Sequence, residues 1–397
     1  MVKSVVTIGL GYIGLPTSAL IASNGVHVKG VDINPEVVDT INRGEIHIVE
    51  PELGEIVKKA VENGYLIADT NTREGDVYLI VVPTPFKEDN EPDISFVESA
   101  TVSIIPLLKE NDLYIIESTS PIGTTEKMKD LIYSQRPELC GKISIAYCPE
   151  RVLPGNVMHE LVYNDRVIGG VDQKSTDDAY TFYRQFVKGE LHKTNARTAE
   201  MCKLTENASR DVQIAFANEL SLICNKANIN VWELIDLANK HPRVNILQPG
   251  CGVGGHCIAV DPYFLTSHFP IESKLISAAR EINNYKAFWC VEKIQNEILK
   301  FELENKRKPV IAICGLAFKP NIDDLRESPA VFIAEKIRQF YPIDLLNFVE
   351  PNLNSHQVFA LSSWETAKAN SDLCFILVAH KEFKGEQSEK IISFVQL

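Results

Sequence analysis

The sequence predicts an α/β protein with two Rossmann-like, doubly wound parallel-sheet domains joined by a long-helix, α-helical middle domain. Apolar, β-branched runs alternate with segments of helical periodicity in the first part of the chain, which is the pattern of a parallel sheet covered by helices. Long helical segments fill the middle, and a second alternation begins near residue 308. We therefore expect domains over residues 1–194, 195–303 and 304–397.

The first domain alternates between apolar strands and helices. Its strands are expected in the stretches VVTIGL, VHVKGVDI, VYLIVV, LYIIES and ISIAYC, and its helices over residues 13–24, 35–43, 52–63, 94–109 and 124–136. Asn34 and Pro35 suit the N-cap and the first turn of a helix. Because the strands are almost continuously hydrophobic, both faces of the sheet should be covered.

The rest of the chain divides into a helical part and a second α/β part. Helices are expected over residues 196–228, 231–240 and 271–301, followed by the charged stretch ENKRKP. The strand VIAICG, a helix over residues 327–340 and the strands IDLLNFV and LCFILVA come after it. The second α/β part therefore resembles the first in pattern, although the residues themselves form no tandem repeat.

The composition disfavours several partners and locations. The formal net charge of the 397 residues is −13, which opposes binding to nucleic acid or anionic lipid. No apolar run approaches the roughly 20 residues that span a bilayer, and the N-terminal stretch lacks the features of an export signal. The nine cysteines are scattered without a zinc-type pattern, so we expect a cytoplasmic protein without a bound metal.

A glycine-rich turn near the N-terminus predicts a dinucleotide site. The stretch GLGYIG follows the first strand and opens the first helix, which places its backbone N–H groups for a pyrophosphate. Asp32 ends the second strand, where it would accept a hydrogen bond from a ribose 2′-hydroxyl and repel a 2′-phosphate, so the expected cofactor is NAD. The residues expected to bind it here are Gly9, Gly11, Tyr12, Ile13, Gly14 and Asp32.

Two further loops follow the expected strands of the first sheet. VVPTPF contains Thr84 and ESTSPIGT contains Thr119, each close to a proline. Ligands of open α/β sheets bind at the carboxyl ends of the strands, so both hydroxyls are expected to reach the cofactor or the substrate. An ordinary strand-to-helix turn has a similar composition, and it is the alternative.

A cysteine in a second glycine-rich loop is the candidate nucleophile. The loop GCGVGGHCIAVDP lets another group approach the backbone closely, and Cys257 lies near its end with Asp261 four residues later. If the next segment is helical, the thiol lies near a helix N-terminus, which favours the thiolate. His256 fits a structural hydrogen bond better than a catalytic role.

Polar side chains elsewhere could serve the same reaction. Lys203 and Asn207 lie four residues apart in the expected long helix, so they share a face and could stabilise an oxyanion. Glu150, in the stretch CPERVLPG, could orient water. Taken alone, a solvated helix face and a surface carboxylate are the alternatives.

The first strand-to-helix loop of the C-terminal part predicts a different anion site. This loop, GLAFKPNIDDLRESPA, lacks the second glycine of a dinucleotide turn, and Lys319 and Arg326 are present instead. Their charges could hold a diphosphate, although Arg326 could also pair with Asp323 or Asp324. One dinucleotide site and one different diphosphate site indicate a nucleotide-sugar substrate.

Together these stretches resemble the UDP-glucose/GDP-mannose dehydrogenase family of nucleotide-sugar 6-dehydrogenases, from the first strand to about residue 385. The resemblance rests on GLGYIGLPT, GEIHIVEP, VPTPF, ESTSPIGTTEKM, AYCPERVLPG, RTAEMCKLTEN, HPRVNILQPG, GVGGHCIAVDP and LAFKPNIDDLRESPA. It implies a four-electron oxidation of a sugar C6 alcohol by two NAD⁺, with Cys257 forming a thiohemiacetal and then a thioester. It also implies an N-terminal NAD-binding domain, a C-terminal UDP-sugar-binding domain and a homodimer built on the middle helices, in which each subunit lends Arg243 to the other.

The resemblance implies roles for individual residues. Lys203 and Asn207 would stabilise the oxygen charge. Thr119, Glu150 and Asp261 would position or activate water. The substrate-binding residues that it implies are Glu150, Arg151, Lys203, Asn207, Arg243, Asn245, Gly254, Lys319 and Arg326.

The identity of the sugar is the finer prediction. EIHIVEP and HPRVNILQPG look most like the members that oxidise UDP-N-acetyl-D-mannosamine to the uronate used in bacterial surface polysaccharide, such as enterobacterial common antigen or capsule. UDP-N-acetylglucosamine and UDP-glucose are the alternatives, because spacing does not report the epimer. A single-hydride β-hydroxyacid-type dehydrogenase and a non-enzymatic NAD-sensing protein are more remote, because neither explains Cys257 together with Lys203 and Asn207.

Two stretches depart from the family pattern. Cys251 stands where similar members usually carry proline, and we hypothesise that oxidation pairs it with Cys257 and inactivates the enzyme. If mild peroxide inactivates a Cys251→Ser variant equally, that idea is wrong. The stretch GEQSEKIISFVQL differs from the usual closing strand, so an altered edge strand is expected.

Overall fold

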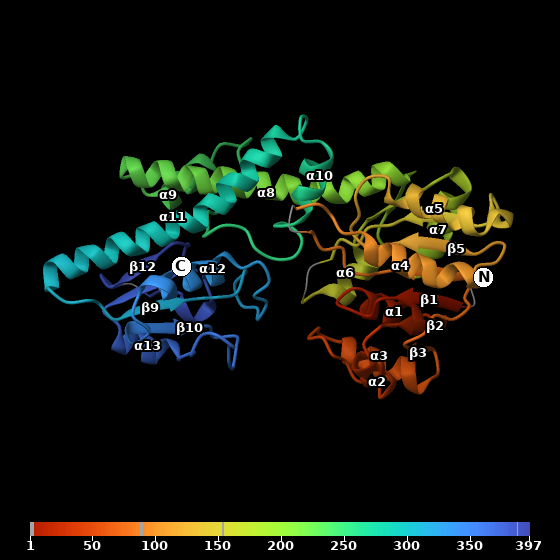
Figure 1. Ribbon diagram of the computed structural model, residues 1–397, viewed down its shortest axis with the longest axis horizontal. Helices are drawn as coiled ribbons and strands as arrows, with labels where there is room; N and C mark the ends of the chain where they lie inside the picture. The colour runs from red at the N-terminus through yellow and green to blue at the C-terminus, as the bar shows by residue number, and fades with distance from the viewer. Residues whose placement is uncertain (1–3, 88–89, 153–154, 387) are drawn as a thin grey trace. The chain divides into compact units, whose positions relative to one another are not determined.

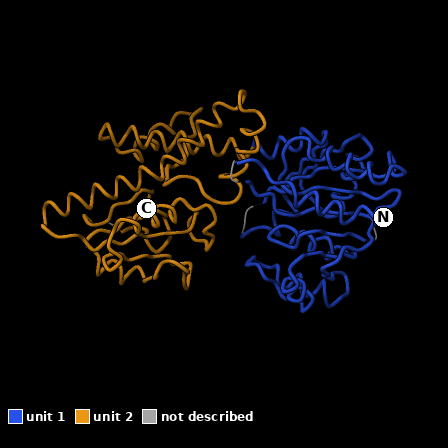
Figure 2. The backbone as a smooth tube through the Cα atoms, in the orientation of Figure 1, with its two compact units in different colours: residues 1–205 blue, residues 206–397 orange. Residues whose placement is uncertain are grey.

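Figure 1 shows the computed structural model of the chain, which forms two compact units, residues 1–205 and 206–397 (Figure 2). The two units do not correspond one-to-one to the three expected domains, whose boundaries remain predictions. The structure describes residues 4–87, 90–152, 155–386 and 388–397.

The first unit contains an eight-stranded sheet. Its strands are β1 (Ser4–Ile8), β2 (His27–Val31), β3 (Leu66–Asp69), β4 (Val77–Ile80), β5 (Leu113–Ile116), β6 (Ser144–Tyr147), β7 (Arg166–Gly170) and β8 (Leu191–Asn195). Its helices are α1 (Gly14–Ser23), α2 (Pro35–Asn42), α3 (Leu53–Glu62), α4 (Ser95–Ile104), α5 (Thr124–Gln135), α6 (Val157–Tyr163) and α7 (Gln173–Tyr183), with short 3-10 helices η1 (Ile105–Leu107) and η2 (Pro137–Leu139).

The strand order of this sheet is that of a dinucleotide-binding fold. The order is β3-β2-β1-β4-β5-β6-β7-β8, and every pair is parallel except β6 with β7. The order reverses between β1 and β4, which is where ligands of doubly wound sheets bind. The doubly wound parallel sheet is therefore confirmed, with one antiparallel pairing that the sequence pattern did not predict.

Two hydrophobic clusters cover the two faces of this sheet. Successive residues of β4 and β5 belong alternately to one cluster with α1, α3 and α7 and to the other with α4 and α5. All residues of both strands are buried. The continuous apolar runs of the sequence thus arise because helices pack on both sides.

The second unit contains a smaller, fully parallel sheet. Its strands are β9 (Ile311–Cys314), β10 (Leu346–Val349), β11 (Leu373–Ile376) and β12 (Ile391–Ser393), in the order β10-β9-β11-β12. Its helices are α9 (Val231–Ala238), α10 (Asp261–His268), α11 (Lys274–Asn305), α12 (Pro329–Phe340) and α13 (Trp364–Asn370), with η3 (Ile343–Leu345) and η4 (Lys381–Phe383). β12 lies in the stretch that departs from the family pattern, and it closes the sheet beside β11.

The long helix α8 (Ala196–Ala227) crosses the division at residue 205, and its second part packs on α11 through buried polar groups. Arg280 Nη1 lies 2.7 Å from Asp211 Oδ1, and Asn283 Nδ2 donates to the same oxygen at 2.8 Å. Asn218 donates to Asn283 and accepts from the backbone N–H of Gly250 at 2.9 Å. This network fixes the start of the second glycine-rich loop against the helix pair.

In the part of the chain that the structure describes, no helix is both long enough and apolar enough to cross a bilayer.

Candidate active site

The three glycines of the first turn are required for two different physical reasons. Gly9 has φ +94°, and a Cβ there would lie 2.2 Å from the carbonyl oxygen of Val81. A Cβ at Gly14 would lie 1.8 Å from the carbonyl oxygen of Gly9. A Cβ at Gly11 would meet no protein atom within 4 Å. Gly9 and Gly14 therefore permit the turn itself, and Gly11 leaves open backbone that a pyrophosphate can approach.

Asp32 is fixed beside this turn at the end of β2. Its carboxylate accepts from the backbone N–H of Leu10 at 3.0 Å and from that of Asn34 at 2.9 Å. Tyr12 and Ile33 flank the turn with exposed side chains, Ile33 being 89% exposed. Sequence reasoning missed Ile33, although an exposed isoleucine directly after the carboxylate expected to bind the ribose suits contact with an adenosine.

His47 is a second residue that sequence reasoning missed. Its ring lies near the backbone of Leu10 and near Asp32, and burial lowers the pKa of His47 despite that carboxylate. Residues 46–51 around it line a hollow in the surface. The stretch EIHIVEP carried the signal, but the sequence did not show that it meets the dinucleotide turn.

Replacing Gly11 with valine should weaken NAD binding without unfolding the protein. The new Cβ would meet no protein atom within 4 Å, so we expect the melting temperature to change by no more than about 2 °C. It would occupy the space that the pyrophosphate needs, so we expect at least about a tenfold rise in the Kd of NAD. Calorimetric titration measures it. Gly14→Ala is the contrast, because its Cβ clashes with Gly9 and should destabilise the fold; equal NAD affinity in Gly11→Val would contradict the assignment.

Thr84 and Thr119 lie on neighbouring loops after β4 and β5. Ser118 ties the two loops together, since its hydroxyl donates to the carbonyl of Val82 at 2.7 Å and the N–H of Val82 lies 2.9 Å from it. Both threonines are half-buried. The structure therefore brings them to the expected edge of the sheet.

A buried carboxylate holds the loop that contains Thr119. Glu200, on α8, accepts from the backbone N–H groups of Gly123 and Thr125 at 2.6 and 2.8 Å and from the Thr125 hydroxyl at 2.6 Å. Burial raises the pKa of Glu200, and these bonds lower it in part. The first turn of α5 is thereby capped from a residue that is 75 positions away in sequence.

Glu150 follows β6 in a loop anchored by a second buried carboxylate. Glu50 accepts from the backbone N–H groups of Gly155 and Val157 at 2.9 and 2.7 Å, which caps α6. Arg151 donates to the carbonyl of Asp165 at 3.2 Å. Two residues of the CPERVLPG stretch, 153 and 154, lie outside the described residues. Glu150 itself is half-buried.

Cys257 lies in a turn that leads into α10. Its carbonyl accepts from the N–H groups of Val260 and Asp261 at 3.0 and 2.8 Å, so the thiol comes one turn before the helix begins. Asp261 is buried and accepts from Asn207 Nδ2 at 2.5 Å. The structure thus joins two of the expected catalytic residues directly, and Lys203 lies one turn before Asn207 on α8, half-buried.

The glycines before Cys257 allow its loop to pack against the loop of the second anion site. A Cβ at Gly254 would lie 2.6 Å from the carbonyl oxygen of Glu327, and one at Gly255 would lie 2.9 Å from the ring of Phe318. The N–H of Gly255 donates to the carbonyl of Arg326 at 3.0 Å. The group that approaches this backbone closely is therefore the protein's own loop of residues 315–330, which contains Lys319 and Arg326. The sequence did not reveal this contact.

Lys319 and Arg326 occupy this loop as expected. Lys319 is exposed, and Arg326 Nη2 lies 2.6 Å from Asp324 Oδ2. Burial alone would raise the pKa of Asp324, but hydrogen bonds from Arg326 lower it, helped by the charges of Arg326 and His256. The pairing that the sequence left open is thus with Asp324, and a bound diphosphate would compete with this carboxylate for the arginine.

The small sheet resembles a dinucleotide fold, but the acidic residue after its second strand, Glu350, points into the protein interior. Glu350 ends β10 and accepts from the N–H groups of Leu316 and Ala317 at 2.7 and 2.9 Å, much as Asp32 accepts from the first turn. Glu350 is only 3% exposed, and His380 Nε2 lies 3.1 Å from its Oε2. The Nδ1 atom of His380 accepts from the N–H of Asn321 at 2.9 Å, so Nε2 carries the proton. This carboxylate cannot reach a ribose, which agrees with a ligand other than a dinucleotide.

Replacing Glu350 with glutamine should reduce the loss of stability in acid. Burial alone would raise the pKa of Glu350, but hydrogen bonds from His380 and the backbone lower it to about 2. The carboxylate therefore contributes stability above its unfolded pKa near 4.5, and this contribution of about 3 kcal/mol is lost as the pH falls toward about 2. The measurement is the melting temperature of wild type and Glu350→Gln between pH 6 and pH 3. Equal slopes would contradict the prediction.

Cys251 is buried, and its thiol donates to the carbonyl of Leu377 at 3.3 Å. A hydrogen bond with Cys290 and burial raise the pKa of the Cys251 thiol well above its usual value. Burial and a high pKa both disfavour the thiolate that disulfide exchange needs. The oxidative pairing with Cys257 stays a prediction, and these observations weigh against it.

Arg243 and Asn245 lie in an exposed loop after α9. Asn239 holds this loop, because its side chain accepts from the N–H of Ile246 at 2.7 Å and donates to its carbonyl at 2.9 Å. Both expected substrate-binding side chains are exposed.

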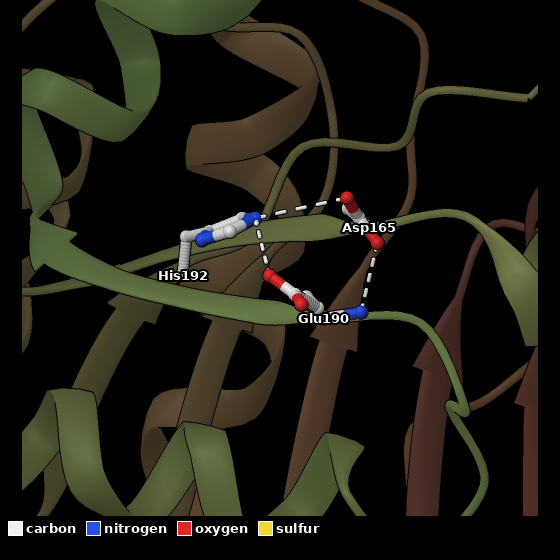
Figure 3. Close-up of side chains that lie close together, drawn as sticks. All are labelled: Asp165, Glu190 and His192. Carbon is white, nitrogen blue, oxygen red and sulfur yellow. Dashed lines mark hydrogen bonds and ion pairs between the residues drawn. The ribbon is translucent and has the colours of Figure 1, made fainter.

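Asp165, Glu190 and His192 come together at the start of β7 and β8 (Figure 3). His192 Nε2 lies 3.8 Å from Asp165 and 3.9 Å from Glu190, and all three side chains are exposed. Asp165 also accepts from the backbone N–H of Glu190 at 2.8 Å. The group is a surface ion-pair cluster that joins two strand ends.

The chain matches known protein domains over most of its length. Residues 3–187 match the NAD binding domain of the UDP-glucose/GDP-mannose dehydrogenase family, residues 197–285 its central domain and residues 312–396 its UDP binding domain. The chain belongs to this family. The resemblance read from the sequence is confirmed, as are NAD as the cofactor and the chain's class as an oxidoreductase.

Individual relatives agree with the family. UDP-N-acetyl-D-mannosamine dehydrogenase of Escherichia coli (strain K12) is 55% identical over 395 residues, covering 95% of this chain and 93% of the relative. The enzyme of the same name from Campylobacter jejuni is 52% identical and covers 99% of both chains. The solved structure of a UDP-D-ManNAc dehydrogenase from Pyrococcus horikoshii has a TM-score of 0.88 at 39% identity, covering 99% of this chain and 96% of that one.

Proposed function

We propose that the chain oxidises the C6 hydroxyl of UDP-N-acetyl-D-mannosamine to the carboxylate, UDP-N-acetyl-D-mannosaminuronate, using two NAD⁺ per sugar. The observation that carries this proposal is that Cys257 lies one turn before α10 with its carbonyl hydrogen bonded to the N–H of Asp261, whose carboxylate accepts from Asn207. The relatives at 52–55% identity that bear the name of this activity support the choice of sugar.

The thiol is needed because one substrate must lose two hydrides. NAD⁺, held by the glycine-rich turn of residues 9–14 and by Asp32, would supply the hydride acceptor for each oxidation. The sulfur of Cys257 adds to the aldehyde carbon, which gives a thiohemiacetal that cannot diffuse away. Loss of the second hydride leaves a thioester. Water then adds to the acyl carbon, the carbon–sulfur bond breaks, and the thiolate of Cys257 leaves with the electron pair.

The other side chains act on charge and protons. Lys203 and Asn207 donate hydrogen bonds to the oxygen that becomes negative as sulfur or water adds to the carbon. Asp261 holds the amide of Asn207 in place through the 2.5 Å hydrogen bond. Glu150 and Thr119 position the water, and Glu150 accepts its proton.

The nucleotide is held by the second unit. Lys319 and Arg326 bind the diphosphate through their charged side chains. The backbone N–H groups after β9 do not serve as a dinucleotide turn, because Glu350 already accepts their hydrogen bonds. Arg151, Asn245 and Gly254 complete the proposed contacts. Because Gly255 donates to the carbonyl of Arg326, binding of the diphosphate is coupled to the position of the loop that carries the thiol.

The experiment that tests this function is the number of NADH formed per nucleotide sugar consumed to completion. UDP-N-acetylmannosamine, UDP-N-acetylglucosamine and UDP-glucose are compared in parallel. Two NADH from the mannosamine nucleotide alone is the expected result. One NADH per sugar would refute the thioester mechanism, and turnover of a different nucleotide alone would replace the substrate.

We also propose that the protein is a homodimer in which Arg243 enters the site of the partner subunit. The helices of the second unit expose large apolar side chains that a second copy would cover. They are Phe216 and Ile223 on α8, Leu237 on α9, and Leu275, Phe288, Leu299 and Leu303 on α11. A cytoplasmic location is proposed as well, since all nine cysteines are free thiols.

Mixing two inactive variants should restore activity if Arg243 acts in the partner's site. Arg243→Ala and Cys257→Ala each inactivate every site of their own homodimers. In a mixed dimer one of the two sites contains both native residues, so subunit exchange should recover about a quarter of the wild-type rate at equal amounts, since about half of the dimers are mixed. Tagged subunits verify that exchange has taken place. If no activity is recovered after verified exchange, action in trans is contradicted.

A further inference from the structure

The loop that contains Lys319 begins beside one residue from each neighbouring strand of the small sheet. It leaves the end of β9, which lies between β10 and β11. Glu350 comes directly after β10, and His380 comes four residues after the end of β11. Because the carboxyl ends of parallel strands meet at one edge of a sheet, both side chains lie where this loop begins. They meet each other there, since His380 Nε2 donates to Glu350 Oε2 at 3.1 Å.

This pair binds the loop on both sides of Lys319 along the chain. On the N-terminal side, the N–H groups of residues 316 and 317 donate to Glu350 Oε2 at 2.7 and 2.9 Å. On the C-terminal side, the N–H of Asn321 donates to His380 Nδ1 at 2.9 Å. Lys319 is therefore two residues from an anchored position in each direction, and both anchors belong to one hydrogen-bonded pair.

Asn321 forms a left-handed turn that is bound twice to the chain after β11. Its φ is +60°, a conformation that is uncommon for residues other than glycine. Besides the bond from its N–H, its side-chain Oδ1 accepts from the N–H of Lys381 at 2.9 Å. The ring of His380 is fully buried and packs edge-on against Phe383, with ring centroids 5.7 Å apart. A fixed imidazole thus holds the turn that follows Lys319.

The two nitrogens of His380 have different partners. Nδ1 accepts from the N–H of Asn321, and Asn352 Nδ2 lies 3.0 Å from the same atom. The proton is therefore on Nε2, which donates it to the buried Glu350. Nδ1 serves the loop and Nε2 serves the carboxylate, so a substitution can remove one of these bonds and keep the other.

We propose that His380 is a positioning residue that, through Nδ1 and the turn at Asn321, holds Lys319 where it meets the diphosphate of the nucleotide sugar. This rests on the proposed function, in which Lys319 binds the diphosphate. Lys319 is exposed and has a long, flexible side chain. Ordering its backbone on both sides reduces the entropy that is lost when the diphosphate binds. His380 therefore acts on the affinity for the nucleotide, and the hydride and thioester steps do not depend on it.

The test compares His380→Gln with His380→Asn by calorimetric titration of the whole chain with UDP. Glutamine places an amide donor near the position of Nε2 and offers no acceptor near Nδ1, whereas asparagine places an oxygen near Nδ1 and nothing near Nε2. We expect the Kd of UDP to rise about tenfold in His380→Gln and to stay within about twofold of wild type in His380→Asn. With the nucleotide sugar, His380→Gln should raise KM about tenfold at nearly unchanged kcat.

The melting temperatures of the same two variants separate positioning from folding. His380→Asn removes a donor from the buried carboxylate of Glu350, so it should have the lower melting temperature. His380→Gln keeps that donor, and the exposed Asn321 can direct its N–H to water. Affinity for UDP and melting temperature should thus rank the variants in opposite orders. If the affinity follows the melting temperature, or if His380→Gln binds UDP as wild type does, the inference is wrong.

A double-mutant cycle with Lys319→Ala tests whether His380 acts through this lysine. In the Lys319→Ala background, His380→Gln should raise the Kd of UDP by less than about twofold further. A full additional loss in the double variant would overturn the inference, because His380 would then act on another contact.

These outcomes are distinguishable from failure of the proposed function, because UDP binding is measured without any oxidation. One NADH per sugar in the wild-type protein would remove the thioester mechanism, and the UDP titrations would still decide the role of His380. Two NADH per sugar, together with unchanged UDP affinity in His380→Gln, would overturn only the role of His380.

Discussion

Replacing Cys257 with alanine should abolish formation of the carboxylate product while NAD still binds. Without the sulfur, the aldehyde has no covalent attachment, so no thioester can form. The residues of the first turn lie in the other unit, and Gly11 and Asp32 do not depend on the thiol. The product is measured by chromatography after complete reaction, and NAD binding by calorimetric titration. We expect acid formation to fall by at least about 10⁴-fold with an unchanged Kd for NAD.

Cys251→Ala is the matched control for this variant. It removes a thiol six residues earlier in the same loop, and this thiol is buried against the carbonyl of Leu377. We expect it to cost some stability through a small cavity and to retain acid formation. Normal acid formation by Cys257→Ala would refute the mechanism. Equal loss in both variants would instead indicate that the loop, rather than the sulfur of Cys257, had been damaged.

The larger part of the fold could be predicted because its signals are local. The strands β4 and β5 are buried on both faces, so their residues are continuously apolar and stand out in the sequence. β8 was not predicted, because LHKTN lies at the edge of the sheet with exposed polar side chains. The strands β3 and β7 were not predicted either, so the antiparallel pairing of β6 with β7 was missed together with β7 itself.

The candidate site divides in the same way. The dinucleotide turn and the thiol loop could be predicted because glycine spacing reports the backbone that a ligand or a neighbouring loop requires. Glu50, Glu200 and Glu350 could not, because each caps or fills a loop that is between 33 and 107 residues away in the sequence. A single acidic residue in a helix or loop carries no mark of such a distant partner, so only the folded chain reveals it.

Replacing Asp261 with asparagine should lower kcat about 100-fold with little change in the KM values. Asp261 is buried at the first position of α10 and accepts from Asn207 Nδ2 at 2.5 Å. Asparagine keeps the shape and can still accept this bond, but the negative charge that orients the amide is lost. A site that stabilises developing charge typically loses 10²–10³-fold in rate when one such group is changed. Loss of the acidic residue from the first turn should cost only about 0.3–1 kcal/mol of stability.

The reciprocal exchange tests whether the charge must be at this position. The double variant Asn207→Asp with Asp261→Asn restores one carboxylate and one amide to the same pair, with donor and acceptor reversed. We expect its melting temperature to exceed that of Asn207→Asp alone, in which two carboxylates face each other, because the exchange restores an amide donor to the pair. We expect kcat to stay low, because the amide no longer projects from α8 beside Lys203. Recovery of kcat in the exchange would show that the pair only supports the fold, and kcat within threefold of wild type in Asp261→Asn would remove Asp261 from the mechanism.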